Sequence, residues 1–459
     1  MQKGGEMGYP IWDIAMGGSV LMAVVAVAHV IVAHFAVGGG LVIAVTETLA
    51  FRRNDGELRQ LAKRSSLMLI LVSTVFGAVS GVGIWVVAGL VAPAAISALI
   101  HNYVWGWAIE WVFFFVEIVC AIVYYDTWGK ISKRAHLFVG WLYFVAAYLS
   151  LVIINGIITF MLTPGKWLST HAFWDGFFNP TYFPSLLLRT GIAAIMASVF
   201  MVFPALKAAM AVRGHLLRYL GWWLVAGVLV SYGGYRWWEA VLPAEIKGLF
   251  LGASPALRQL ATTRHFLLWA LAATLVLGVL LLAVPRLARV VPAVVLMIAG
   301  FAFFAGFEWV REGVRKPFLI HDYMFSNGLL VSDIGAINDE GLLARAGWAA
   351  HDADDDPLSR GRQVFRAECS SCHTIDGYQG IRRLLPPDPD MTFGVLSTLS
   401  EMGDAYGELA PGQRIDMSSL DYPFMPPFVG SDEELEELAQ YLNSLAASGG
   451  RLAEKGAGQ

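Results

Sequence analysis

Eight long apolar stretches constrain this chain more than any other feature of its sequence. A helix needs about 20 mostly apolar residues to cross a bilayer, and each stretch is long enough. Of the 459 residues, 57% are hydrophobic and 15% are charged, whereas soluble domains are about 25% charged. This composition excludes a disordered chain, a nucleic-acid-binding protein and an ordinary soluble enzyme. The predicted stretches are Met16–Phe51, Ser65–Val91, His101–Tyr125, His136–Leu162, Pro184–Ala211, Leu216–Val241, Thr262–Val284 and Val291–Val310.

The loops between these stretches alternate in charge, and this pattern predicts their orientation. Cytoplasmic loops of membrane proteins are enriched in Lys and Arg. The even-numbered loops hold only Lys166, Lys247 and Arg258. The odd-numbered loops are richer, with Arg52, Arg53, Arg59, Lys63, Arg64, Lys130, Lys133, Arg134, Lys207, Arg213, Arg218, Arg286 and Arg289. We therefore predict a multi-pass protein of a bacterial inner membrane, anchored in lipid, with both ends outside the cytoplasm and the first stretch as an uncleaved anchor.

The net charge of −4 hides two regions of opposite sign. The segment from Asp352 to the end holds 19 acidic and 8 basic residues, a net charge of −11, and the first 351 residues carry +7. The two regions therefore face different solvents and partners. We predict an all-α protein with an eight-helix transmembrane domain at 1–312, a periplasmic linker at 313–356, a small helical domain at 357–449 and a flexible tail at 450–459.

Two of the three cysteines form a motif. Cys369 and Cys372 are separated by two serines and followed by His373, whereas Cys120 stands alone in an apolar stretch. In a C-x-x-C-H motif the two thiols bind the vinyl groups of haem and the histidine binds its iron. A zinc or redox site is the alternative for such a cysteine pair, but His373 and the predicted outward position favour covalent haem c. Haem is attached in this way outside the cytoplasm, which agrees with the outward position that the loop charges predict for this part of the chain.

The residues around this motif predict a small class I cytochrome c fold. Helices are expected at Pro357–Ala367 and Asp432–Leu445, the second with a capping box of Ser431 and Glu434 and an end at Gly449 and Gly450. The iron needs a second axial ligand, often Met. We predict Met425, because the prolines around it stiffen its loop. The rival ligands are Met391, Met402 and Met417.

Two acidic residues in the third apolar stretch are candidate catalytic residues. Charges inside a bilayer are costly and usually functional. Glu110 and Glu117 are seven residues apart and therefore lie on nearly one helix face. They are expected to form a proton relay or to approach a haem. A buried hydrogen-bonding pair is the alternative.

Histidines in the apolar stretches are candidate haem ligands, because neutral imidazole binds haem iron. His29 and His34 are five residues apart in the first stretch, roughly 140° around a helix, and are therefore not expected to bind the same iron. His265 opens the seventh stretch, and His101 is a weaker candidate. The alternative for each histidine is a structural role in the core, with its ring nitrogens hydrogen-bonded to protein groups. By contrast, the basic surroundings of two further histidines predict interface residues: His136 and His215.

A further set of residues lies in or next to the predicted stretches: His29, Glu47, Thr48, Glu110, Glu117, Asn179, Pro180, Glu312, Gly313, Arg315, Lys316 and Pro317. In these residues the chain resembles subunit I of the cytochrome bd-type terminal oxidases. The resemblance implies that His29 is a haem ligand, and that Glu110 and Glu117 lie near the high-spin haems on a proton path. It also implies b-type haems, with a d-type haem as a further possibility, and a related membrane subunit as partner, in a hetero- or homodimer.

The chain also departs from this family. The long quinol-binding loop between helices six and seven and the ninth helix are missing, and a cytochrome c domain follows instead. Near the position of the family's low-spin haem histidine the chain has Arg189, and the methionine partner on helix seven is not evident, although His265 is nearby. For the glutamate ligand on helix eight, both Glu308 and Glu312 are candidates.

Together, these observations predict a respiratory membrane haem protein that works as a terminal oxidase. An acidic outer domain would take electrons from a basic periplasmic protein or cytochrome, and oxygen would be reduced at a membrane haem. The rival interpretation is a non-catalytic electron-transfer subunit that links membrane haems or the quinone pool to periplasmic cytochromes. A third interpretation keeps haem c as the only cofactor and the membrane helices as a structural partner.

Overall fold

The computed structural model describes residues 12, 14–251, 255–346, 356–409, 415–417 and 420–456. It separates into two compact units. One contains Val25–Gly83 and Ile100–Val314, and is called here the membrane unit. The other contains Met1–Val24, Ile84–Leu99 and Arg315–Gln459, and is called the outer unit after the location that the loop charges predict for it. The acidic residues Asp352, Asp354 and Asp355 of the predicted linker lie outside the described residues.

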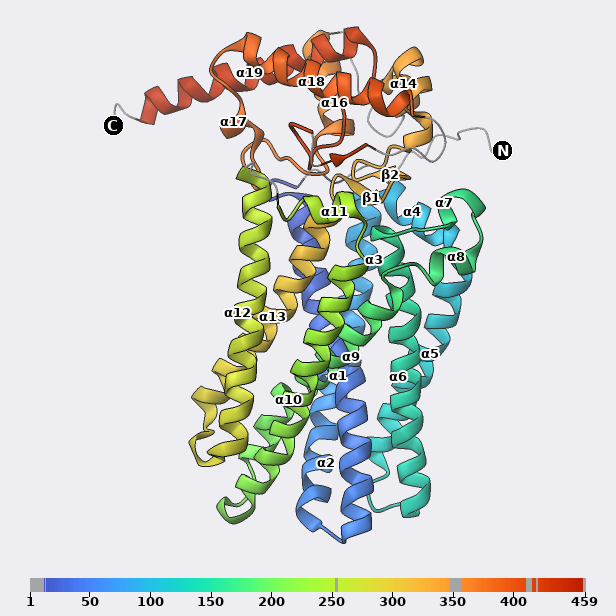
Figure 1. Ribbon diagram of the computed structural model, residues 1–459, viewed down its shortest axis with the longest axis vertical. Helices are drawn as coiled ribbons and strands as arrows, with labels where there is room; N and C mark the ends of the chain where they lie inside the picture. The colour runs from blue at the N-terminus through green and yellow to red at the C-terminus, as the bar shows by residue number, and fades with distance from the viewer. Residues whose placement is uncertain are drawn as a thin grey trace. The chain divides into compact units, whose positions relative to one another are not determined.

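Eight helices are long and apolar enough to cross a membrane in the part of the chain that the structure describes, which confirms the predicted number (Figure 1). The third begins at Val104 rather than His101, because Pro93–Asn102 forms a separate helix, α4. The eight spans are α1 (Gly18–Arg53), the continuous α2–η1–α3 (Gly56–Val91), α5 (Val104–Asp126), α6 (Lys133–Leu162), α9 (Tyr182–Leu206), α10 (Met210–Val241), α12 (Pro255–Ala283) and α13 (Val290–Arg315).

Local sequence fixes the ends of several spans. The Asp55 carboxylate accepts hydrogen bonds from the amides of Glu57 and Leu58 at the start of α2, and Ser132 caps α6 through the amide of Ala135. Both are residue types that favour the N-cap, because their oxygens satisfy amides without helical partners. The second span changes pitch at Ile70–Gly77, where it is a π-helix, η1. Such segments are rare and often occur at functional sites.

Small residues let the spans of the membrane unit approach closely. A Cβ at Gly38 of α1 would overlap the carbonyl of Ala193 in α9, and a Cβ at Gly191 would overlap Ser231 of α10. Such close packing is common between membrane helices, because the hydrophobic effect does not favour their association in lipid and van der Waals contact must do so. Large apolar side chains such as Val79 and Trp222 are exposed on the surface of this unit, as expected for residues that face lipid.

The outer unit contains the folded part of the predicted linker. Within 315–346 the chain forms an antiparallel hairpin of β1 (Phe318–Ile320) and β2 (Met324–Phe325), followed by η3 (Val331–Asp333), α14 (Ile334–Glu340) and α15 (Leu342–Arg345). Two hydrogen bonds tie it to the cytochrome-like region, because the Glu434 carboxylate accepts from the amides of Leu342 and Leu343. Glu434 also accepts from the amide of Ser431, as the predicted capping box requires.

The rest of the outer unit is helical. Helix α16 (Pro357–Glu368) is close to its predicted limits, and α17 (Ile381–Leu384) and α18 (Pro389–Gly407) were not predicted. Helix α19 starts at Asp432 as expected but runs to Gly456, so the predicted end at Gly449 and Gly450 is wrong. A glycine inside a helix costs only about 1 kcal/mol, which does not force an end. Of the predicted tail, residues 457–459 lie outside the described residues.

Candidate haem sites and buried charges

The C-x-x-C-H motif forms a tight turn at the end of α16. The amides of Cys372 and His373 both donate to the carbonyl of Cys369. The His373 Nδ1 lies 2.9 Å from the carbonyl oxygen of Gln379. Because a carbonyl only accepts, Nδ1 carries the proton and the Nε2 lone pair is left for a metal. This tautomer and the two nearby thiols fit a covalently attached haem.

The two thiols of the motif differ in their surroundings. Burial raises the pKa of the Cys369 thiol above its ordinary range. Burial also disfavours the Cys372 thiolate, but the Lys316 ammonium, 3.3 Å from Cys372 Sγ, together with hydrogen bonds from Ser371 and Ser326, leaves the pKa of Cys372 lowered. The thiolate is the reactive form of cysteine, so Cys372 is the more readily activated of the two. Lys316 belongs to the stretch that resembles the bd-type family.

Met425 lies in the predicted loop, and its position as axial ligand stays a prediction. Its side chain is half-buried, and its amide donates to the carbonyl of Tyr422. The loop is held against α18, because the amide of Phe428 donates to Leu399. Of the rival methionines, Met391 is 58% exposed, whereas Met402 and Met417 are buried.

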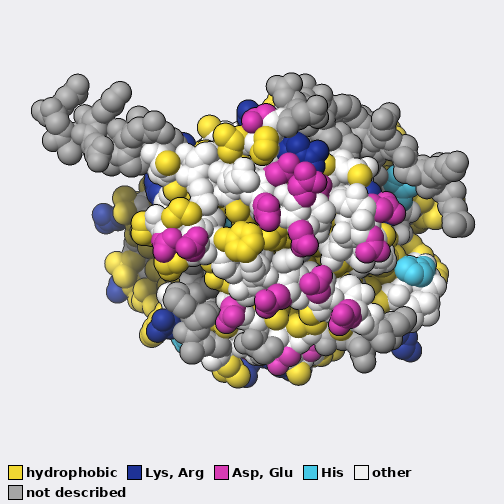
Figure 2. Space-filling view, turned by 90° about the horizontal axis from the view of Figure 1, so that it is seen from above, with side chains coloured by type: hydrophobic (Ala, Val, Ile, Leu, Met, Phe, Trp, Pro, Cys, Tyr) yellow, Lys and Arg dark blue, Asp and Glu magenta, His cyan; other side chains and the backbone are white. Residues whose placement is uncertain are grey.

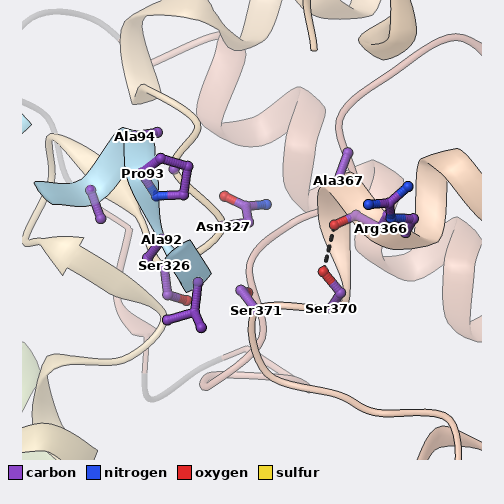
Figure 3. Close-up of a pocket in the computed structure, with 12 residues that line it drawn as sticks. Ala92, Pro93, Ala94, Ser326, Asn327, Arg366, Ala367, Ser370 and Ser371 are labelled. Atoms are coloured by element: carbon purple, nitrogen blue, oxygen red, sulfur yellow. Dashed lines mark hydrogen bonds between the residues drawn. The ribbon is translucent and has the colours of Figure 1, made fainter. Parts of the chain in front are cut away.

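A small pocket of about 40 Å³ lies beside the motif within the outer unit (Figure 3). One side is formed by the corner between α3 and α4, with Pro93, and by the hairpin loop with Asn327. The other side is formed by α16 and the motif, where the Ser370 hydroxyl donates to the carbonyl of Arg366 at 2.6 Å. The volume suits a few water molecules.

The loop that follows the motif contacts the start of the chain, because the amide of Tyr378 donates to the carbonyl of Met16.

Glu368, which precedes the motif, is a buried carboxyl group that sequence reasoning did not identify. It accepts from Asn327 Nδ2 at 2.7 Å and from the amide of Val429 at 3.2 Å, and so joins the hairpin, α16 and the methionine loop. Burial, with a smaller contribution from Glu434, raises its pKa to about 8 despite these two donors.

The raised pKa of Glu368 predicts a pH-dependent stability of the outer unit. An acid whose pKa is higher in the folded than in the unfolded state stabilises the fold below its unfolded pKa and loses that contribution as the pH rises through the folded value. We therefore expect the free energy of unfolding to fall by roughly 3–5 kcal/mol between about pH 5 and pH 9. Denaturant unfolding of the holoprotein, followed by haem c absorbance, measures this change. The Glu368→Gln variant should lack it, and the exposed Glu401→Gln variant should keep it; a Gln variant with the full pH dependence contradicts the assignment.

His29 and His34 of α1 lie in different surroundings. His29 Nδ1 is 3.1 Å from the Ser80 hydroxyl of α3, and its ring packs against Gly81. His34 is 3% exposed; its Nδ1 donates to the carbonyl of Val30 at 2.7 Å, and its buried Nε2 has no hydrogen-bond partner among the described residues. An oriented imidazole with a free buried lone pair fits a haem ligand, so His34 fits this role at least as well as His29.

Arg189 and Glu308 form a buried ion pair. Arg189, 1% exposed, lies 2.8 Å from Glu308 Oε1, and Arg311 Nε donates to Glu308 Oε2 at 2.9 Å. Both carboxylate oxygens of Glu308 are therefore engaged by guanidinium groups, and Arg189 also lies over the ring of Phe307. This arrangement, called here the Arg189–Glu308–Arg311 triad, does not fit an iron bound by Glu308. The other candidate on this helix, Glu312, is 3.6 Å from Arg311.

The two predicted catalytic acids lie on the face of α5 that packs against α6. Glu117 is buried and accepts from the Tyr143 hydroxyl at 3.0 Å. Glu110 accepts from the Ser150 hydroxyl at 2.8 Å. His265 is exposed on α12, where its Nδ1 donates to the carbonyl of Ala261. Its assignment as a ligand stays a prediction.

His136 is not an interface residue, contrary to the prediction from its basic neighbours. It is 3% exposed and lies 2.7 Å from the carboxylate of Glu47, which is 1% exposed. Tyr124 completes the group by donating to the other oxygen of Glu47 at 2.7 Å. The neighbours Lys133 and Arg134 suggested the membrane surface, but the helix turns His136 inward toward a carboxylate 89 residues away in sequence.

Comparisons with known proteins agree with this architecture. Residues 19–231 match the family model of cytochrome bd terminal oxidase subunit I, and residues 356–442 match that of subunit III of cbb3-type cytochrome c oxidase. No curated protein gives a match. Among solved structures, the bd oxidase from Geobacillus thermodenitrificans is similar, with a TM-score of 0.56 and 15% identity over 66% of this chain and 88% of that one. At this identity, the likeness concerns the fold. The chain therefore joins an N-terminal region that matches cytochrome bd oxidase subunit I to a C-terminal region that matches the cytochrome c subunit III of cbb3-type oxidases.

Proposed function

We propose that this protein is the redox subunit of a membrane oxidase that takes electrons from a basic protein outside the cytoplasm and delivers them to oxygen. Bound haem groups supply the one-electron chemistry and, at an iron with an open position, the reduction of oxygen. The observation that carries the proposal is the joining of a bd-type membrane domain, with buried histidine and glutamate side chains, to a domain with a C-x-x-C-H motif in one chain.

The residues of this chain have separate tasks in the proposal. Cys369 and Cys372 would bind the covalent haem, and His373, with its Nε2 free, would bind its iron. Met425 is the proposed second ligand. In the membrane unit, His29 and His34 are the proposed ligands of b- or d-type haems, and Glu110 and Glu117 hold protons that the reduction of oxygen consumes.

The surface of the outer unit suits a basic donor. Seen from above, Asp and Glu side chains are spread over this face with few Lys or Arg (Figure 2). The exposed acidic residues of the outer unit include Asp388, Asp390, Glu401, Asp432, Glu433 and Glu436. A surface of one charge raises the association rate of an oppositely charged partner. This charge favours a cytochrome or another basic protein of the periplasm as donor.

The Arg189–Glu308–Arg311 triad favours a second candidate function. Because Glu308 is held by two guanidinium groups, one of the two candidate positions for the glutamate ligand on the eighth helix is taken by an ion pair. A chain with fewer membrane haems could act as an electron-transfer subunit without oxygen chemistry of its own. In either function, the resemblance to the bd-type oxidases suggests a second membrane subunit of related fold.

Oxygen uptake with a basic c-type cytochrome as donor tests the proposal. We expect the purified protein to consume oxygen when supplied with the reduced cytochrome. The rate should fall at least about tenfold between about 10 mM and 500 mM salt, because salt screens the attraction between the two surfaces.

Charge variants give the matched comparison for this experiment. Glu433→Lys with Glu436→Lys should lower the rate at low salt and leave it unchanged at high salt. Glu57→Lys makes the same type of change in the exposed first turn of α2 in the membrane unit and should have no effect. Reduction of the haems by the cytochrome without oxygen uptake would favour the second candidate, and no reduction at all would contradict both.

A further inference from the structure

The facing sides of α5 and α6 carry three pairs of polar residues at regular intervals. Tyr124, Glu117 and Glu110 follow one another at seven-residue steps on α5, and His136, Tyr143 and Ser150 do so on α6. The two helices are packed against each other and run in opposite directions, so the sequences pair as Tyr124 with His136, Glu117 with Tyr143 and Glu110 with Ser150. Seven residues of helix rise about 10 Å.

The three pairs therefore form a row of about 20 Å along the helix axes, a large part of the roughly 30 Å hydrocarbon core. We call them the first, second and third rungs, and the first rung includes Glu47 of α1, which contacts both Tyr124 and His136. The first rung lies at the end of the spans where the loops are basic: Glu47 is five residues before Arg52, and His136 is three residues after Lys133. Positive loops mark the cytoplasmic side.

The first rung must hold a proton in a buried place. His136 Nε2 lies 2.9 Å from the carbonyl oxygen of Tyr124, which only accepts, so Nε2 carries a hydrogen. His136 Nδ1 lies 2.7 Å from Glu47 Oε1. A hydrogen bond there needs one further proton, either on the imidazole or on the carboxyl group. The pair is neutral with this proton and would be a buried anion without it, which is costly.

The second rung connects α1 and the π-helical segment to the same row. The Tyr143 hydroxyl contacts Glu117 at 3.0 Å and the carbonyl of Ala36 at 3.2 Å. Ser73, within η1, lies near Tyr143, and its hydroxyl donates to the carbonyl of Leu69. Gly40 leaves room for this ring, because a Cβ there would overlap it. Tyr143 thus contacts both α1 and α5 through its hydroxyl.

From this geometry we propose that the Glu47–His136–Tyr124 rung is the entry relay that delivers protons from the basic-loop side to Glu117 and Glu110. The proposal rests on the proposed function, in which these two acids supply the protons for oxygen reduction. A proton passes from the shared Glu47–His136 position along hydrogen-bonded water to Glu117, and a proton from the aqueous side replaces it. The pair then regains its single proton and its neutral charge.

Stopped-flow measurement of the intact holoprotein in detergent tests this proposal. A pH-indicator dye reports proton uptake, and haem absorbance reports reduction and reoxidation in the same mixing experiment with oxygen. Glu47→Gln removes the carboxyl group that binds and releases a proton, so we expect proton uptake to slow at least about tenfold. Reduction of the haems by the external donor should keep its rate. Glu47→Asp should restore part of the uptake.

Two controls separate a proton relay from a structural role. Thr48→Val removes a polar group that contacts the carbonyl of Ala44 and Trp141 outside the row, and should leave both rates unchanged. Tyr124→Phe keeps the Glu47–His136 pair but removes one donor to Glu47, and should slow proton uptake less than Glu47→Gln does. If Glu47→Gln does not fold, Tyr124→Phe and His136→Gln provide the same comparison.

The outcomes distinguish this proposal from the proposed function. Proton uptake at the wild-type rate in a folded Glu47→Gln variant overturns the relay and leaves the oxidase function standing. Reoxidation of the wild-type haems without proton uptake also overturns the relay. Wild-type haems that oxygen does not reoxidise contradict the proposed function, and the relay that depends on it fails with it.

Discussion

Replacing Cys369 and Cys372 with alanine is expected to remove the covalent haem and to slow electron entry from an external cytochrome by more than about 100-fold. The two thiols are the only covalent attachment points that the C-x-x-C-H motif offers. Without them, His373 keeps its free Nε2 but holds no tethered group. Denaturing gels stained for haem measure the attachment, and stopped-flow reduction of the remaining haems by reduced cytochrome c measures the rate.

The third cysteine provides the matched control. Cys120 is buried in α5, and the Cys120→Ala variant should keep both the haem stain and the rate. Direct reduction of the double variant by dithionite should still reduce the membrane haems, because this small reductant does not need the docking surface. Unchanged electron entry in the double variant would show that electrons reach the membrane unit by another route.

Replacing Arg189 with leucine is the second change with a large expected effect. It leaves Glu308 buried with one guanidinium group instead of two. Breaking a buried ion pair by removing one partner typically costs 3–5 kcal/mol, and we expect a loss of about this size in the stability of the membrane unit. Thermal unfolding in detergent, followed by tryptophan fluorescence, measures it.

An exposed arginine gives the comparison for this variant. Arg236 is 58% exposed and 3.8 Å from Glu239, so Arg236→Leu should cost less than about 1 kcal/mol. The same preparations test the role of Glu308: Glu308→Gln should keep its membrane haem content. Loss of a haem from the Glu308→Gln variant would mean that Glu308 binds iron in the holoprotein. The Arg189–Glu308–Arg311 triad would then not form when the haem is bound.

Much of the fold follows from local sequence. The number of spans was predicted correctly because a run of about 20 apolar residues is a local property. The same holds for the start of α19, where Ser431 and Glu434 form the capping box within four residues. The limits of α4 and the length of α19 were not predicted, because proline and glycine bias a helix end without fixing it.

The arrangement of the buried charges could not be predicted in this way. Glu308 pairs with Arg189 across 119 residues, and Glu47 pairs with His136 across 89. Each partner alone suggested something else: a haem ligand for Glu308, and a membrane-surface residue for His136. The repeat of seven residues on α5 was visible as Glu110 and Glu117, but its counterpart on α6 consists of three different residue types, His136, Tyr143 and Ser150, and does not stand out as a repeat. Only the packing of the two helices shows that they form one row.

The carbon monoxide difference spectrum of the reduced protein, together with a pyridine haemochrome count, tests the central claim most directly. An oxidase needs a membrane haem with an open iron position in addition to haem c. The account predicts one c-type haem per chain, at least one b- or d-type haem, and a carbon monoxide-induced shift in the membrane haem bands. A full complement of haems with no response to carbon monoxide would contradict oxygen reduction by this chain.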